Sequence, residues 1–188
     1  AYESGQPCVG DMFDWFVRRN VPEEYMLQAR EQGISIHQLL TEKAAALTPG
    51  QSGLVALDWW NGQRTPFVDD DLSGVMLGLT LRTRPEEQYR ALLEGSAYGV
   101  RLIFDTYRKA GMDAQEFIVC GGIAQKNPLM MQIYSDVLGH PIRVSSSDQA
   151  CALGAAILAA AAARCHDSLD AAMAAMAAHP ETEYLPNA

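Results

Sequence analysis

The sequence predicts an α/β fold in which strands pair in parallel. In the last third of the 188-residue chain, strand-like and helix-like segments alternate over 116–120, 129–138, 142–144 and 149–164, and this alternation is typical of parallel α/β layers. The first of these strands stops at two adjacent glycines, Gly121 and Gly122. Apolar residues make up 48% of the chain, which is enough for a substantial core.

The chain opens with two predicted helices. Apolar residues at helical spacing indicate a helix over 11–19, which Val21 and Pro22 end. The same spacing runs from 25 to 47 and indicates one further helix, which the turn formers at 48–50 stop.

Two strands and the longest helix follow. Strands are expected over 53–59 and 73–81, on either side of a loop rich in turn-forming and acidic residues. Pro85 marks the first turn of a helix that runs to about Lys109 and ends at Gly111. At the far end, 167–179 is predicted to be an Ala- and Met-rich helix, so we expect 167–188 to be a helical tail that carries little information.

Composition excludes several classes of function. The net charge of −9, with no basic run longer than Arg18-Arg19, argues against a nucleic-acid surface. The Ala-rich run at 150–163 is too short and too weakly apolar to span a bilayer, so no membrane association is expected. The cysteines lack CxxC spacing, which predicts reduced thiols in a cytoplasmic protein. The histidines are scattered without a common spacing, so no metal site is expected.

The glycine pair at the end of the 116–120 strand has two interpretations. Without Cβ atoms, Gly121 and Gly122 let a nucleotide base or a phosphate approach the backbone closely. The alternative is a tight strand-to-helix turn that binds nothing. Cys120, just before the pair, is expected to be buried and to fill space in the core. Three small residues, Ala152, Gly154 and Ala155, are expected to allow close packing of a helix on the sheet.

Several segments resemble one family of enzymes. The stretches 74–80 and 87–101 resemble the second signature of the FGGY carbohydrate kinases, although Tyr89 stands where an aliphatic residue is more usual. Gly121-Gly122, Asn127, the 132–139 stretch and 152–156 follow in the order of that family. The resemblance covers the chain from residue 2 to about 163.

Within that family, two further segments are similar to the ribulokinases. They are 3–11 and 57–66, the second of which places Asp58-Trp59 before a Gly-x-Arg-Thr-Pro loop. The resemblance implies transfer of a phosphoryl group from ATP, with Mg²⁺, to L-ribulose or a close ketopentose in arabinose catabolism. The alternatives are another substrate such as xylulose, and a non-catalytic nucleotide-binding module of the actin kind.

The resemblance also implies a fold and partners. The fold would be the ribonuclease-H-like domain of the actin-like ATPase superfamily, a mixed sheet flanked by helices, and 1–188 would be the carboxy-terminal domain of a longer two-domain kinase. The amino-terminal domain would supply the catalytic base, so this chain is expected to be inactive alone. Its partners would be the sugar, ATP and that missing domain, and a homo-oligomer is allowed.

The family likeness assigns site residues but no catalytic residue and no metal ligand. Glu3 and Gln6 would bind sugar hydroxyls, and Arg64 would supply charge near the transferred phosphoryl group. The alternative for Arg64 is an ion pair with an aspartate of 69–71, and for Glu3 a role as an N-terminal acid or cap ahead of the first helix. The implied nucleotide-binding residues are Gly62, Gln63, Gly121, Gly122, Ile123, Asn127 and Met131.

Overall fold

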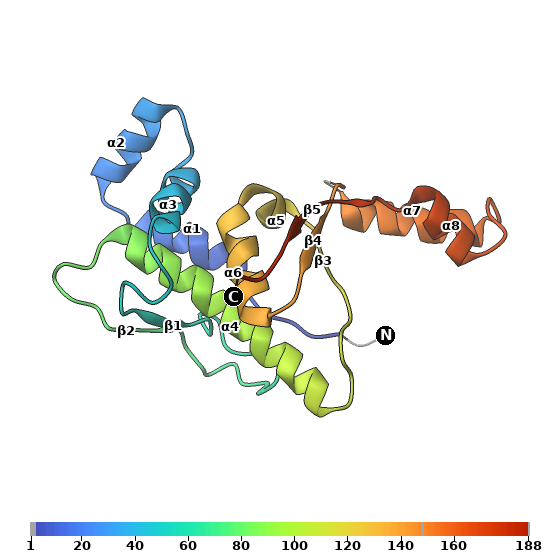
Figure 1. Ribbon diagram of the computed structural model, residues 1–188, viewed down its shortest axis with the longest axis horizontal. Coiled ribbons are helices and arrows are strands. Elements are labelled where there is room, and N and C mark those ends of the chain that lie inside the picture. Colours follow the sequence, from blue (N-terminus) through green and yellow to red (C-terminus); the bar gives the residue numbers. More distant parts are fainter. Residues whose placement is uncertain (1–2, 148, 188) are drawn as a thin grey trace. The chain divides into compact units, whose positions relative to one another are not determined.

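The computed structural model describes residues 3–147 and 149–187, and Figure 1 gives the order of their elements. The chain divides into two compact units, 1–114 and 115–188, and each is described by itself. The assignment of 1–188 to one kinase domain stays a prediction. None of the helices in the described ranges is both long enough and apolar enough to cross a bilayer.

The first unit is built on a long helix. Its buried apolar side chains include Phe16, Leu40, Tyr89, Leu92 and Leu93, which come from three helices. A two-stranded antiparallel sheet completes the unit. The elements are α1 (Val9–Asn20), α2 (Glu23–Gln32), α3 (Ile36–Ala45), β1 (Val55–Leu57), β2 (Val75–Leu77) and α4 (Pro85–Lys109).

The prediction of one helix over 25–47 is wrong, because the chain breaks between α2 and α3. Gly33 adopts a left-handed conformation, with φ of 67°, and ends α2. Ser35 then caps α3, since its side chain accepts a hydrogen bond from the Gln38 backbone N–H at 3.1 Å. The apolar spacing continued across this break and concealed it.

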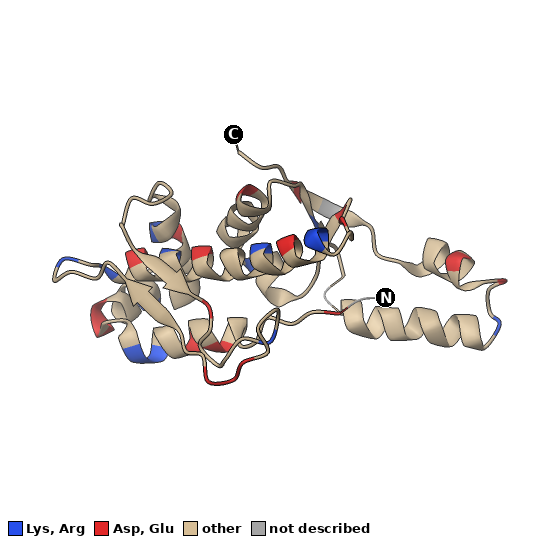
Figure 2. Ribbon diagram, turned by 90° about the horizontal axis from the view of Figure 1, so that it is seen from below, with Lys and Arg blue, Asp and Glu red and all other residues tan. Residues whose placement is uncertain are grey.

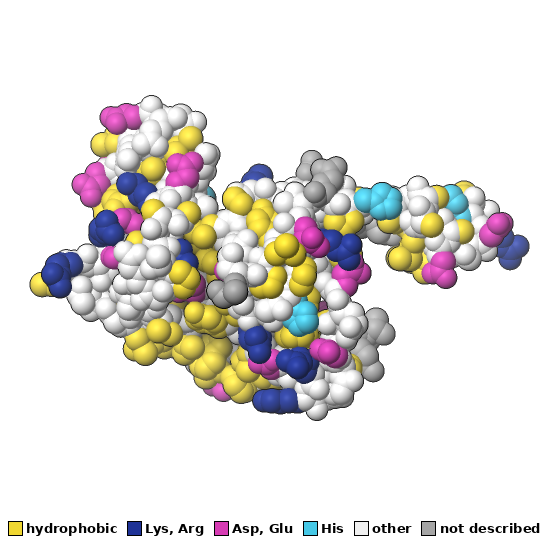
Figure 3. All heavy atoms as spheres, in the orientation of Figure 1, with side chains coloured by type: hydrophobic (Ala, Val, Ile, Leu, Met, Phe, Trp, Pro, Cys, Tyr) yellow, Lys and Arg dark blue, Asp and Glu magenta, His cyan; other side chains and the backbone are white. Residues whose placement is uncertain are grey.

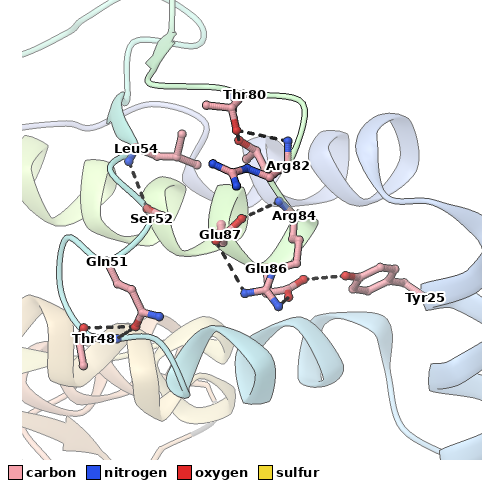
Figure 4. A network of polar contacts seen from close by, with 11 residues as sticks. Tyr25, Thr48, Gln51, Ser52, Leu54, Thr80, Arg82, Arg84, Glu86 and Glu87 are labelled. Atoms are coloured by element: carbon pink, nitrogen blue, oxygen red, sulfur yellow. Dashed lines mark hydrogen bonds and ion pairs between the residues drawn. The ribbon is translucent and has the colours of Figure 1, made fainter.

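The long helix α4 confirms the predicted bounds of 85–109. Pro85 occupies its first turn, and Glu87 reaches back to the Arg84 backbone N–H at 2.6 Å. Figure 4 shows that Tyr25 of α2 lies against the start of α4, where its hydroxyl donates a 2.7 Å hydrogen bond to the buried Glu86 carboxylate. Arg84 pairs with the other oxygen of Glu86 at 3.3 Å, so this carboxylate is well satisfied.

The small sheet is covered on one side only in the described part of the chain. Ala56 is buried and β1 contacts α4, whereas the cross-strand pairs Val55–Leu77 and Leu57–Val75 share the other face and are exposed. Figure 3 shows apolar side chains gathered on the surface over this hairpin. The predicted strand over 73–81 is shorter than expected because Gly78, with φ of 91°, ends it.

The second unit contains a three-stranded mixed sheet in the order β3-β4-β5. The predicted parallel pairing is confirmed: β3 and β4 run in parallel, with Phe117 opposite Ile142, while β5 is antiparallel to β4. Helix α6 contacts both β4 and β5. The elements are β3 (Phe117–Val119), α5 (Gly122–Lys126), α6 (Pro128–Leu138), β4 (Ile142–Ser145), α7 (Ala150–Ala162), α8 (Leu169–Met176) and β5 (Pro180–Tyr184).

The helical tail predicted for 167–188 is wrong in its last part. Helix α8 stops at Met176, and Pro180–Tyr184 forms a strand that pairs with β4. The buried Ser135 hydroxyl of α6 bonds the Tyr184 carbonyl at 2.9 Å, so the sheet and α6 together hold this segment. Tertiary pairing of this kind has no signal in local sequence spacing.

Two expectations about small side chains are also wrong. Cys120 is exposed, because it lies beyond the last paired residue of β3. Ala152 and Ala155 are exposed, and a Cβ on Gly154 would meet no atom within 4 Å. Helix α7 buries Ile157 and contacts α8; Figure 2 shows it without charged residues.

Candidate functional site

The amino-terminal segment of the first unit is held by a polar cluster around Gln6. The Gln6 side-chain amide donates one hydrogen bond to the Asp58 carboxylate and another, of 2.8 Å, to the Ser96 carbonyl of α4. Asp58 is half-buried, and none of the described residues forms an ion pair with it. Burial raises the pKa of the Asp58 carboxyl, and the hydrogen bond from Gln6 partly opposes that rise.

Two glycines of α4 allow this cluster to form. A Cβ on Gly99 would lie 2.7 Å from Asp58 Cγ, and one on Gly95 would lie 2.7 Å from the Ala56 carbonyl oxygen. Contacts this short do not occur between real atoms, so β1 and Asp58 approach α4 only because these positions lack side chains. The 87–101 stretch therefore lets the helix come close to the Gln6 segment.

The Gly62–Arg64 segment belongs to a loop that the Gln63 side chain holds together. Gly62 has φ of 76°, and a Cβ there would lie 2.7 Å from Asp70 Cα. The buried Gln63 donates to the Thr65 carbonyl and accepts a 3.0 Å hydrogen bond from the Phe67 backbone N–H. Both polar ends of Gln63 thus bond within its own loop, which is a structural use of a residue predicted to bind nucleotide.

Arg64 and Glu3, both predicted to contact substrates, contact each other. Arg64 Nη2 lies 3.4 Å from Glu3 Oε1, and the two side chains are 65% and 84% exposed. The partner of Arg64 is therefore Glu3 and not an aspartate of 69–71, the alternative considered from the sequence. Nor does Glu3 cap the first helix, because Cys8 occupies the position before α1. An ion pair this exposed contributes only about 0–1 kcal/mol and is easily exchanged for another partner.

Trp60 lies at the start of the same loop. Its ring packs at a tilt against the ring of Trp15, with centroids 5.0 Å apart, and a Cβ on Gly74 would lie 2.6 Å from Trp60 Cε3. Trp60 therefore has a packing role in this loop. The indole Nε1 of Trp60 is buried and has no acceptor within the described ranges.

The glycine turn of the second unit is open. Gly121 has φ of 98°, and neither it nor Gly122 would bring a Cβ within 4 Å of another atom. Ile123 is 42% exposed beside them. These three predicted nucleotide contacts are thus free to meet a ligand.

The other two predicted contacts of this unit have packing roles. Asn127 is buried, and its side-chain oxygen accepts from the Met130 backbone N–H at 3.0 Å, which caps α6. Met131 is 2% exposed and belongs to the core. Neither side chain presents a free surface comparable to that of the glycine turn.

A hollow of about 270 Å³ lies beside the short helix that follows these glycines. It offers hydroxyl groups from β4, from the loop after it and from β5. None of these residues was predicted from the sequence, because strand β5 was not expected; the serines at 145–147 were the available signal. The lining consists of Ala124, Gln125, Val144, Ser145, Ser146, Thr182 and Tyr184.

Across 3–147 and 149–187, no three side chains of His, Cys, Asp or Glu gather in a way that could hold a metal ion. The four cysteines are free thiols, at positions 8, 120, 151 and 165.

The predicted site residues thus form two sets. Glu3, Gln6, Gln63 and Arg64 lie in the first unit, and the glycine turn lies in the second. The class of protein is α/β, with a polar cluster held by a long helix in the first unit and an open backbone turn at the end of a parallel strand in the second.

This chain belongs to the FGGY family of carbohydrate kinases: residues 1–163 match the C-terminal domain of that family. It is 50% identical to a ribulokinase of Bacillus licheniformis over 98% of this chain and 34% of that protein. It is 47% identical to a ribulokinase of Mycolicibacterium smegmatis, again over 98% of this chain. The chain spans about a third of the length of these curated relatives.

Solved structures support the fold. A xylulose kinase from Rhodospirillum rubrum matches with a TM-score of 0.73 and 28% identity, over 95% of this chain and 33% of that one. A glycerol kinase from Plasmodium falciparum, solved with ADP, has a TM-score of 0.70 at 23% identity over 95% of this chain and 33% of its own, a likeness of fold alone. The predicted fold class, a mixed sheet flanked by helices as in actin-like ATPases, is confirmed.

Proposed function

We propose that this chain is the carboxy-terminal part of a kinase that transfers the γ-phosphoryl group of ATP to a hydroxyl of L-ribulose. The observation that carries the proposal is the 50% identity to a ribulokinase over 98% of the chain. The cluster of Gln6, Asp58 and Ser96 supports it, because it joins both segments that distinguish ribulokinases, 3–11 and 57–66. The 28% identity to a xylulose kinase favours that sugar less.

The glycine turn would hold the adenosine part of ATP. Gly121 and Gly122 leave the backbone uncovered, and the exposed Ile123 offers an apolar contact for a flat base. The hydroxyl-lined hollow beside α5 gives polar partners close to that turn. Asn127 and Met131 would act indirectly, by fixing the start of α6 and the core beneath it.

When substrates bind, Glu3 and Arg64 would separate from each other, and each would contact a substrate instead. The Glu3 carboxylate would accept hydrogen bonds from sugar hydroxyls, and the Arg64 guanidinium would face the negative charge of the phosphates. Their mutual ion pair is exposed and weak, so separating them costs little. Gly62 and Gln63 would shape the loop that presents Arg64.

The reaction also needs a catalytic base and Mg²⁺ ligands, which we do not assign to residues of this chain. A new bond forms between the sugar oxygen and the γ-phosphorus, the bond to the β-phosphate oxygen breaks, and the hydroxyl proton passes to a base. We assign that base to an amino-terminal domain, so the chain alone would be inactive. Mg²⁺ would arrive with ATP, and we assign no ligand for it among the described residues.

The substrate is tested by steady-state kinetics of the full-length kinase with L-ribulose, D-ribulose, D-xylulose and glycerol. We expect preference for L-ribulose and a large loss of kcat/KM in Glu3→Ala. Glu24→Ala, which removes an exposed acid of α2, is the matched control and should change nothing. Preference for another sugar, with Glu3→Ala unaffected, would contradict the substrate and the role of Glu3.

The nucleotide site is tested by adding a side chain to the glycine turn. The fold has room for a Cβ at Gly122, so Gly122→Leu should fold and yet block the nucleotide. We expect the KM for ATP to rise at least tenfold, while the KM for the sugar stays within about twofold. Ala45→Leu, at an exposed position of α3, controls for the added leucine. An unchanged KM for ATP in Gly122→Leu would place the nucleotide elsewhere.

A further inference from the structure

The donors and acceptors around Gln6 fix the orientation of its side-chain amide. Both acceptors that face it, the Asp58 carboxylate oxygen and the Ser96 carbonyl oxygen, require a hydrogen-bond donor. Only the amide nitrogen Nε2 can donate, and its two hydrogens match the two acceptors. The carbonyl oxygen Oε1 must therefore point away from them, and none of the hydrogen bonds found among the described residues uses it.

We propose that Asp58 is a positioning residue, which holds the Gln6 amide so that Oε1 faces the sugar as a hydrogen-bond acceptor. This inference rests on the proposed function and assigns a role to a residue that the sequence analysis did not place in the site. The ligand group that such an acceptor selects is a hydroxyl, which donates its hydrogen. The Glu3 carboxylate, in the same short segment, is an acceptor of the same kind.

The surroundings of Asp58 suit a positioning role better than direct contact with the sugar. The backbone of α4 at Gly99 packs directly against the carboxylate, since a Cβ there would lie 2.7 Å from Asp58 Cγ. The contacts recorded for this half-buried carboxylate are to Gln6 and to its own backbone. A carboxylate held in this way by a neighbouring amide and a helix is placed to act on the ligand through that amide.

The inference predicts a specific pattern in the full-length kinase. Asp58→Ala removes the acceptor and frees the Gln6 amide to rotate, so the KM for L-ribulose should rise about tenfold while kcat and the KM for ATP stay within twofold. Asp58→Asn keeps an oxygen that can accept from Nε2, so it should restore the KM to within about threefold of the unmodified enzyme. Asp14→Ala, at an exposed aspartate of α1, is the matched control and should leave every constant unchanged.

A double-variant cycle separates positioning from contact. Gln6→Ala should raise the KM for L-ribulose about as much as Asp58→Ala, and the double variant should be no worse than Gln6→Ala alone. Additive losses, or a loss in Asp58→Asn as large as that in Asp58→Ala, would show that the carboxylate contacts the sugar itself and would overturn the inference.

A second variant keeps the test decisive if Asp58→Ala does not fold. Gln6→Glu keeps acceptor oxygens at this position but loses both donors, so it should lose as much as Gln6→Ala. Full activity in Gln6→Glu would overturn the inference, because an acceptor would then suffice without being oriented. An unmodified kinase that phosphorylates no ketopentose would overturn the proposed function and this inference with it, whereas the outcomes above concern Asp58 alone.

Discussion

Arg90, on α4, donates hydrogen bonds to carbonyl groups at the end of α3. Its replacement should lower the unfolding free energy more than most other substitutions in the first unit. The side chain is 6% exposed. Its Nη1 donates to the Ala44 and Leu47 carbonyls at 2.9 and 2.6 Å, and its Nε donates to the Glu94 carboxylate at 2.8 Å. The Ala44 carbonyl lies in the last turn of α3 and also accepts from the Leu47 backbone N–H at 3.1 Å, whereas the Leu47 carbonyl lies just beyond the helix and relies on Arg90.

The size of the loss follows from what Arg90→Met leaves behind. Methionine has a similar length but no donors, so Glu94, which is 8% exposed, becomes a buried carboxylate without its cation. Breaking a buried ion pair on one side costs about 3–5 kcal/mol, and a buried acceptor left without a donor costs about 1–3 kcal/mol. Because the site can relax, these losses overlap, and we expect a total of about 5 kcal/mol.

A second substitution separates the two losses. Arg90→Met combined with Glu94→Gln removes the uncompensated charge and leaves only the Leu47 carbonyl without its donor, so the loss should fall to about 1–3 kcal/mol. Arg101→Met, which breaks the half-exposed pair with Asp105 on the same helix, is the control and should cost less than about 1 kcal/mol.

Hydrogen exchange of the α3 and α4 peptides in the full-length kinase measures these losses locally, and urea unfolding gives the global value. A loss below about 1 kcal/mol in Arg90→Met would refute the reasoning, because burial and three hydrogen bonds would then count for little. A double variant as unstable as the single one would refute the part assigned to Glu94.

Four further outcomes are expected. Tyr25→Phe should destabilise the protein by about 1–3 kcal/mol in urea unfolding, because Glu86 is buried and loses a donor. Gly99→Ala should raise the KM for the sugar, measured by coupled assay, because its Cβ displaces the Asp58 carboxylate. Burial raises the pKa of Asp58, so the folded protein holds this proton more tightly than the unfolded chain. The unfolding free energy of the unmodified protein should therefore fall, relative to that of Asp58→Asn, as pH rises from the ordinary pKa of a carboxyl through the raised one. Urea titration at several pH values measures this difference. Trp60→Phe should cost less than about 1.5 kcal/mol by thermal unfolding, because it removes a buried donor that has no acceptor among the described residues.

Local signals predicted the elements whose ends are marked in the sequence. Pro85 and Gly111 bracket α4, and the prediction of that helix is confirmed at both ends. Gly33 is an equally strong marker, but the apolar spacing carried on past it and two helices were predicted as one. Strand β5 could not be predicted, because Pro180–Tyr184 becomes a strand through pairing with β4, a contact between distant parts of the chain.

Some features of the candidate site could be predicted from local sequence, and others depended on tertiary contacts. The openness of Gly121 and Gly122 follows from glycine chemistry and was expected from the sequence. The use of Gln63 and Asn127 inside the fold was not expected, because an amide that binds a ligand and one that braces a loop or caps a helix look alike in sequence. Asp58 was read only as a mark of the ribulokinases, since its contact with Gln6 spans 52 residues.

The stretch 87–101, which is part of the resemblance to the family's second signature, lies entirely within α4 and acts there through packing. Arg90 holds the end of α3, and Gly95 and Gly99 admit β1 and Asp58 to the helix surface. None of these residues needs to touch a substrate for its identity to matter. The chemistry proposed here is carried by the short segments that this helix positions, 3–6 and 62–64. Substitutions in α4 should therefore reach catalysis by moving Gln6 and Asp58, and their effect on the KM for the sugar should follow the closeness of their contact with that pair.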